Sequence, residues 1–160
     1  MAIKCVIDSA TIISLTKIDA LEILIKLNFL LSCPEEVYRE TVEDSFLHGY
    51  YEAIKIKKLF DSRVIKIEKV QETTIKGISS VDAKVIYLAA FQNGIVLTND
   101  STLARKSLSK GLEVFGSPDI LTLAKERKLI SEREFVTMIK LLVIKKRLSA
   151  ENAEAYLKGD

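Results

Sequence analysis

Short apolar runs alternate with amphipathic segments along residues 1–117. The apolar runs are rich in Ile, Val and Leu and are too short for helices, which is typical of strands in a buried parallel sheet. Segments with apolar residues at helical spacing separate them. This alternation predicts a parallel α/β sheet whose strands are joined by right-handed crossovers. The expected strands are Ile3–Ile7, Phe29–Ser32, Val64–Ile67, Ile95–Thr98 and Leu112–Phe115.

Hydroxyl, acidic and proline residues mark where the expected helices begin. Ser9, Asp19 and Ser80 are the expected N-caps, because each side chain can accept a hydrogen bond from a first-turn N–H. Pro34 is expected at the first position of another helix, which places Glu40 about two turns into it. A further amphipathic helix is expected over residues 50–60.

The pattern changes after residue 117. From there on the sequence predicts helices only, over residues 119–128, 131–147 and 149–158. We therefore expect a core of residues 1–117 and a helical extension of residues 118–160. The extension is expected to pack on the core or on a partner, because its apolar positions need cover.

The composition fits a folded domain that needs no covalent staple. Apolar residues make up 48% and charged residues 29% of the 160 residues, which is a globular balance. Cys5 and Cys33 lie in apolar stretches, and two buried thiols are favoured over a disulfide. The N-terminal residues do not resemble a signal peptide, and the longest uncharged stretch, residues 27–34, is far too short to span a bilayer. We expect a soluble cytoplasmic protein without a membrane contact.

The charge is divided unevenly along the chain. Residues 1–100 hold 14 acids and 12 bases, and residues 101–160 hold 8 acids and 12 bases, which together give the net charge of +2. A polyanion that is held by a metal at one end and by Lys and Arg at the other would fit this division. Two ordinary solvated helix faces would also fit it.

Acidic residues stand where two expected strands end and where an expected helix begins. Asp8 follows the first strand, Asp100 follows the strand Ile95–Thr98, and Asp82 lies in the first turn of its helix. Ligands of an open parallel sheet bind beyond the carboxyl ends of its strands. These three acids are therefore expected at one edge of the sheet, and Glu40 joins them if its helix leans over that edge.

Clustered carboxylates repel one another unless a cation lies between them. Mg²⁺ and Mn²⁺ prefer oxygen ligands and keep several waters, so a few carboxylates suffice to bind them. Such an ion can activate a water and stabilise charge on a phosphodiester, which needs no histidine base. The four acids thus predict a divalent-metal site.

Each acid also has an ordinary interpretation. Asp8 could be a turn acid, Asp82 an acid favoured by the helix dipole, and Asp100 the cap of a helix that starts at Ser101. Glu40 could be a solvated helix residue, and Glu36, one turn before it, competes with it for the same face. Only the joint spacing of the four acids supports a metal site.

Other chemistries find less support in the sequence. It contains no GxGxxG and no GxxxxGK[ST], which argues against dinucleotides and P-loop nucleotides. It contains no GxSxG nucleophile elbow. An aspartyl-phosphate phosphatase would want a second Asp two residues after Asp8, where this chain has Ala10.

Four short motifs that contain these acids resemble the PIN-domain family of metal-dependent nucleases. They follow one another in the order that the family has, and together they span residues 3–116. The motifs are VIDSATIISL (6–15), CPEEVYRE (33–40), SSVDAKVIYLA (79–89) and IVLTND (95–100). The tail sequence SPDILTLAKERKLIS is similar to that of a prokaryotic toxin-like subgroup.

The resemblance implies a fold, a cofactor and a reaction. It implies a three-layer α/β/α fold around a mostly parallel sheet of four or five strands, with C-terminal helices added. It implies Mg²⁺ or Mn²⁺ and endonucleolytic cleavage of single-stranded RNA. Carried over by position, the acidic quartet is Asp8, Glu40, Asp82 and Asp100. Ser9 and Thr98 match hydroxyl residues that support the first Asp, and Asn99 stands where an additional acid sometimes occurs.

The resemblance also implies partners. Many members are toxins that a small antitoxin protein neutralises, and many form homodimers. We therefore expect a metal-dependent endoribonuclease that is the toxin of a type II toxin–antitoxin pair and forms a homodimer. A catalytically inactive PIN-like module that binds RNA or protein is the alternative, and a metal-dependent phosphatase is the less favoured one.

Overall fold

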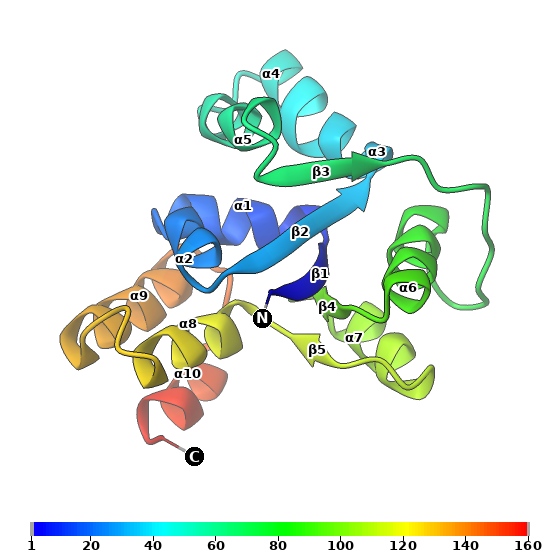
Figure 1. Cartoon of the computed structure of the whole chain (residues 1–160). Coiled ribbons are helices and arrows are strands. Elements are labelled where there is room, and N and C mark those ends of the chain that lie inside the picture. The colour runs from blue at the N-terminus through cyan, green and yellow to red at the C-terminus, as the bar shows by residue number, and fades with distance from the viewer. Residues whose placement is uncertain (1, 160) are drawn as a thin grey trace.

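A five-stranded parallel sheet forms the middle layer of this protein, for which a computed structural model describes residues 2–159 (Figure 1). The strand order is β3-β2-β1-β4-β5. The chain thus proceeds from β1 outward to β3, and then crosses to the other side of β1 for β4 and β5. The predicted parallel α/β sheet is confirmed. The strands are β1 (Ile3–Ile7), β2 (Phe29–Pro34), β3 (Ile65–Glu68), β4 (Ile95–Leu97) and β5 (Val114–Phe115).

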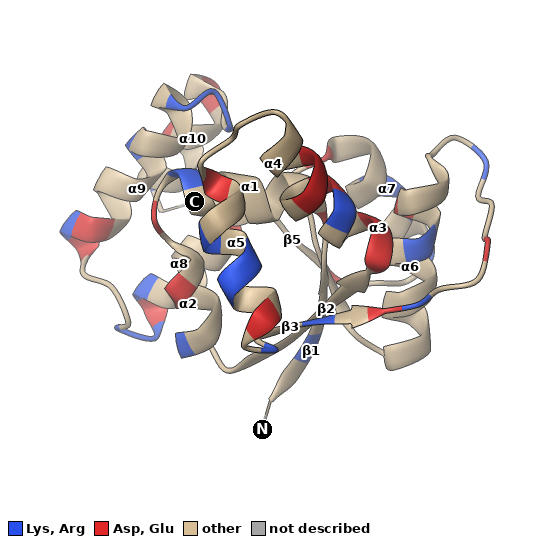
Figure 2. Cartoon of the chain, turned by 90° about the horizontal axis from the view of Figure 1, so that it is seen from above, with Lys and Arg blue, Asp and Glu red and all other residues tan. Residues whose placement is uncertain are grey.

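Helices cover both faces of the sheet and complete a three-layer α/β/α arrangement, which two views of the chain show (Figure 1, Figure 2). One face carries α1 (Ser9–Lys17), α2 (Leu21–Lys26) and α8 (Ser117–Glu126). The opposite face carries α6 (Ser80–Gln92) and α7 (Ser101–Ser109). Within residues 2–159, no helix has both the length and the apolar character that crossing a membrane requires.

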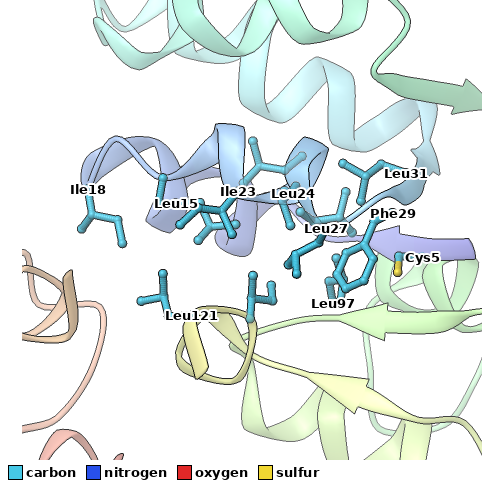
Figure 3. Close-up of a cluster of buried hydrophobic side chains, with 14 of the residues drawn as sticks. Cys5, Leu15, Ile18, Ile23, Leu24, Leu27, Phe29, Leu31, Leu97 and Leu121 are labelled. Atoms are coloured by element: carbon cyan, nitrogen blue, oxygen red, sulfur yellow. The ribbon is translucent and has the colours of Figure 1, made fainter. Parts of the chain in front are cut away.

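Alternation along β1 divides the buried residues into two clusters, because successive side chains of a strand point to opposite faces. Cys5 and Ile7 belong to the larger cluster, and Val6 belongs to the smaller one under α6 and α7. Figure 3 shows part of the larger cluster, in which Leu121 of α8 lies below the side chains of α1 and α2. The strand β1 therefore holds both layers of helices in place.

The connection between β2 and β3 consists of more and shorter helical segments than the sequence predicts. It contains α3 (Glu35–Tyr38), the π-helical segment η1 (Arg39–Glu43), α4 (Asp44–Leu47) and α5 (Glu52–Asp61). Pro34 is the last residue of β2 and the N-cap of α3, not a residue inside the helix. The segment η1 widens the helix locally, a feature that is frequent at functional sites.

Two predicted N-caps are wrong by one residue. Asp8, not Ser9, caps α1, and its carboxylate accepts a hydrogen bond from the first turn at 3.0 Å. Ser79, not Ser80, caps α6 and accepts one at 3.1 Å. In both places two residues that can cap stand side by side, and the cap is the one whose backbone stays extended. The sequence alone does not distinguish them.

Asp19 does not cap α2. The N-cap position belongs to Ala20, and no side chain there accepts a first-turn N–H. Asp19 has a φ of 57°, in the left-handed region that Asp tolerates better than most residues. Its N–H donates to the Thr16 carbonyl at 3.1 Å. It therefore closes α1 and leaves α2 without a side-chain cap.

The last three helices pack on the core. Helix α8 contributes to the larger buried cluster, and so do α9 (Glu132–Ile144) and α10 (Ala150–Leu157). Arg147, between α9 and α10, donates from Nε to Ser14 Oγ at 3.0 Å and from Nη2 to the Ala10 carbonyl at 3.4 Å. Tyr156 donates to Asp119 at 2.7 Å. The boundary at residue 117 stays a prediction.

The two cysteines are free and buried, as the sequence predicts. Burial raises the pKa of the Cys5 and Cys33 thiols to about 12. At pH 8 the reactive thiolate is then on the order of one molecule in 10,000. We expect neither thiol of the native protein to react with Ellman's reagent within minutes, and both to react in guanidinium chloride. Rapid reaction of the native protein would contradict this burial.

Candidate functional site

Strand order reverses between β1 and β4, and the two strands are hydrogen-bonded neighbours. The Asp8 N–H, directly after β1, donates to the carbonyl of Leu97 at the end of β4 at 3.2 Å. Asp100 follows β4 and starts α7. The switch point of an open parallel sheet is where its ligands bind. Asp8 and Asp100 therefore lie at the same edge, which the sequence alone left conditional.

Asp8 is the buried member of the site, with only 6% of its surface exposed. Its Oδ1 accepts from the Thr11 N–H at 3.0 Å, and its Oδ2 accepts from the Thr98 hydroxyl at 2.5 Å. Burial raises the pKa of Asp8 above its ordinary value, the bonds from Thr11 and Thr98 oppose this, and the charge of Asp100 adds to it. Two donors thus hold a carboxylate that the interior disfavours.

Thr98 ties Asp8 to Asp100. Its buried hydroxyl donates to Asp8 and accepts from the Asp100 N–H at 3.0 Å. The Asp100 carboxylate accepts from the Leu103 N–H at 2.8 Å and so caps α7, as its ordinary interpretation predicts. Thr98 thus makes the contact with Asp8 that its predicted supporting role requires.

Asp82 lies close enough to the other three acids for their charges to affect its pKa. Its side chain is partly buried in the first turn of α6. Burial raises the pKa of Asp82 most, and the charges of Asp8, Asp100 and Glu40 each raise it further. The four acids therefore lie within electrostatic reach of one another.

Glu40 reaches this edge from η1. Its carboxylate accepts from the Ser9 hydroxyl at 2.8 Å, and its carbonyl accepts from Ser45 Oγ at 3.1 Å. Ser9 therefore supports Glu40, and its expected support of Asp8 is not what the structure shows. The helix leans over the edge as Glu40 requires.

Glu36 is not available to compete with Glu40. Its carboxylate pairs with Lys84 of α6, a side chain that is only 8% exposed. This ion pair joins elements that are far apart in the sequence, so no local pattern predicts it. A lysine among the apolar residues of α6 is the signal that could have drawn attention to this ion pair, because a buried charge needs a partner.

Asn99 does not face the four acids through its amide. Its Nδ2 donates to Ser117 Oγ at 2.7 Å, and its Oδ1 accepts from the Ser117 N–H at 2.6 Å. The side chain thus connects the end of β4 to the start of α8. Asn99 acts here as a structural link between the site and the C-terminal helices.

The site offers carboxylate oxygens without a closed cage. Across residues 2–159, no three His, Cys, Asp or Glu side chains lie close enough together to hold a metal ion. A hydrated Mg²⁺ is commonly held by one or two carboxylates and keeps several waters. The donor chemistry therefore fits a hydrated hard cation. Burial first, and neighbouring acids second, raise the pKa of Asp8 and Asp82, and a cation would offset both effects.

We predict that Thr98→Val destabilises the protein by about 1–3 kcal/mol, because it leaves Asp8 Oδ2 and the Asp100 N–H without their partner. Thr16→Val is the matched control. The Thr16 hydroxyl is also buried, but it donates only to the Ile12 carbonyl within its own helix, α1. Its loss is expected to stay below about 1 kcal/mol. Urea unfolding measures both. Equal losses would contradict a special role for Thr98.

Comparison with known proteins places this geometry in a family. Residues 4–158 match the family DUF3368, which is described as a PIN domain. The search of curated proteins found no match. A PilT N-terminus domain protein from the archaeon Sulfolobus solfataricus P2 is similar in structure, with a TM-score of 0.55 and 13% identity over 76% of this chain and 93% of that one.

A domain of a functionally unknown protein from Methanocaldococcus jannaschii DSM 2661 also matches, with a TM-score of 0.47 and 22% identity over 71% of this chain and 89% of that one. The Sulfolobus structure supports the fold alone at this identity. The family match covers nearly the whole chain and includes all four acids. The chain therefore belongs to the PIN-domain family.

Proposed function

We propose that this protein is a Mg²⁺- or Mn²⁺-dependent endoribonuclease that cuts single-stranded RNA. Its proposed active site consists of Asp8, Glu40, Asp82 and Asp100. The convergence at the β1–β4 switch point carries the proposal, because Thr98 joins Asp8 to Asp100 and Ser9, the residue after Asp8, holds Glu40. The charges of the other three acids act on Asp82 as well. PIN domains are generally nucleases, which supports the reaction class. The choice of single-stranded RNA rests on the resemblance of the four motifs.

The four acids differ in what they can do. Asp8 is held by two donors and fixes the inner side of the site. Asp100 and Glu40 are exposed, and each accepts a single hydrogen bond within residues 2–159, which leaves its second oxygen for a ligand. All four carboxylates would contribute to holding the ion. When bound, the ion would activate a water and stabilise charge on the scissile phosphodiester.

A catalytically inactive PIN-like module that binds RNA or protein is the second candidate. Both oxygens of Asp8 already accept hydrogen bonds from protein donors. This observation favours a structural role for Asp8, and with it binding without cleavage. The experiment below separates the two functions.

We further propose that the protein is the toxin of a type II toxin–antitoxin pair in the cytoplasm and forms a homodimer. The toxin-like tail sequence supports this role. Exposed apolar side chains on and near α4 and α5 support a protein partner, since large apolar groups gathered on a surface favour an interface. They are Phe46, Leu47, Tyr50, Tyr51 and Ile54.

We predict that the purified protein cleaves labelled single-stranded RNA in Mn²⁺ and not in EDTA. Asp82→Asn and Asp8→Asn should each slow cleavage by about 100-fold or more, because loss of a group beside a metal ligand alone reduces activity by about 10- to 100-fold. Asp61→Asn is the matched control, since Asp61 is an exposed acid of α5 that pairs with Lys57. It should cleave like the wild type.

Different results would contradict different parts of this proposal. Cleavage that survives both site substitutions, or that proceeds in EDTA, would overturn the metal-dependent site. RNA that binds without cleavage in Mg²⁺ or Mn²⁺ would favour the inactive module. The same RNA annealed to its complement tests the preference for single strands.

We predict that expression of the wild type in a bacterial host arrests growth and that Asp8→Asn does not, because arrest by a nuclease toxin requires cleavage. Asp61→Asn should arrest growth like the wild type. Co-expression of a small protein encoded beside this chain should restore growth. Growth that is unaffected by the wild type, or equally arrested by Asp8→Asn, would contradict the toxin role.

A further inference from the structure

Lys84 is a buried cation beside the candidate site. Only 7% of its surface is exposed, and its Nζ contacts the carboxylate of Glu36 and lies 3.4 Å from Glu72. Glu72 is 74% exposed, so that contact is screened by solvent and contributes little. The pair of Lys84 with Glu36 is therefore the main interaction.

This ion pair joins the two segments that carry Asp82 and Glu40. Lys84 stands two residues after Asp82 in α6, and Glu36 stands one helical turn before Glu40. Neither acid is linked to the other by a hydrogen bond within residues 2–159. The Lys84–Glu36 pair is thus the side-chain link between the helices that present them.

Glu36 depends on Lys84 for its place. Its Oε1 is buried and has no hydrogen-bond partner within the described residues, so the carboxylate is held through Oε2 alone. Removal of one partner of a buried pair leaves an uncompensated charge, which is strongly unfavourable. Without Lys84, the Glu36 carboxylate would turn toward water and displace α3.

Helix α3 is held to the core by the buried Val37 and by Tyr38, which packs against Phe60. The loss of Lys84 would therefore shift the helix without detaching it. It has four residues and continues directly into η1, where the regular helical bonding changes. A shift of α3 therefore passes to Glu40, whose carboxylate is held within residues 2–159 by the hydrogen bond from Ser9 alone. Asp82 keeps its place, because α6 is a longer helix with a side-chain cap.

We propose that the Lys84–Glu36 ion pair is a positioning device that sets Glu40 opposite Asp82 and so determines the affinity of the site for a divalent cation. Lys84 touches neither the cation nor the substrate and acts through Glu40. The inference rests on the proposed metal site. Its test measures metal binding itself, so that it does not depend on RNA cleavage.

The test is a double-mutant cycle on Mn²⁺ binding, measured by isothermal titration calorimetry on the full chain. Lys84→Met and Glu40→Gln should each weaken Mn²⁺ binding by about tenfold, the scale on which supporting residues affect metal sites. The double variant should bind no more weakly than Glu40→Gln alone, because Lys84 acts through Glu40. A purely structural role of Lys84 would make the two effects add.

Lys17→Met is the matched control. Lys17 pairs with Glu52 at 2.8 Å and also joins two helices, α1 and α5, through partly buried side chains. It should bind Mn²⁺ like the wild type. If Lys84→Met does not fold by circular dichroism, Glu36→Gln takes its place in the same cycle.

Wild-type affinity in Lys84→Met, or additive losses in the double variant, would overturn the positioning role while leaving the nuclease proposal intact. Mn²⁺ binding that follows the expected pattern without any RNA cleavage would support the positioning role and overturn the nuclease. A wild type that does not bind Mn²⁺ would overturn both.

Discussion

The cost of holding carboxylates at the β1–β4 edge, first from burial and then from mutual repulsion, is the constraint on which the site depends. Asp8 is buried where a charge is poorly solvated, and Asp100 adds a like charge nearby. The backbone N–H of Thr11 and the hydroxyl of Thr98 offset this by donating to both Asp8 oxygens. Because Asp8 and Asp100 also cap α1 and α7, the same groups terminate two helices and bring negative charge together.

Much of this edge could be predicted from the sequence. Strand boundaries follow from apolar runs, and an acid directly after a strand projects at its carboxyl end. Asp8, Asp82 and Asp100 are placed by such local rules. The caps were misplaced by one residue because Asp8-Ser9 and Ser79-Ser80 each offer two adjacent acceptors. Only the backbone angles of the folded chain decide between them.

Glu40 could not be placed in the same way. Its position follows from the π-helical turn of η1 and from the hydrogen bond with Ser9, which is remote in the sequence. We propose that the equally remote Lys84–Glu36 pair sets it as well. A residue four positions away, Glu36, has the same charge and the same helical face. Burial of Lys84 separates the two, because it neutralises Glu36 and leaves Glu40 exposed. Such a pairing is visible only once the fold is known.

The graded burial of the acids gives the edge its chemical character. Acids in unlike environments take unlike roles, since the interior disfavours charge while solvent tolerates it. Burial, and to a lesser degree repulsion by neighbouring acids, raises the pKa of Asp8 and Asp82, whereas Asp100 and Glu40 are exposed where a ligand could reach them. A closed cage of carboxylates would intensify that repulsion in the absence of a ligand. An open edge, held by Thr98 on one side and by the Lys84–Glu36 pair on the other, keeps the acids near one another at a smaller cost to the folded state.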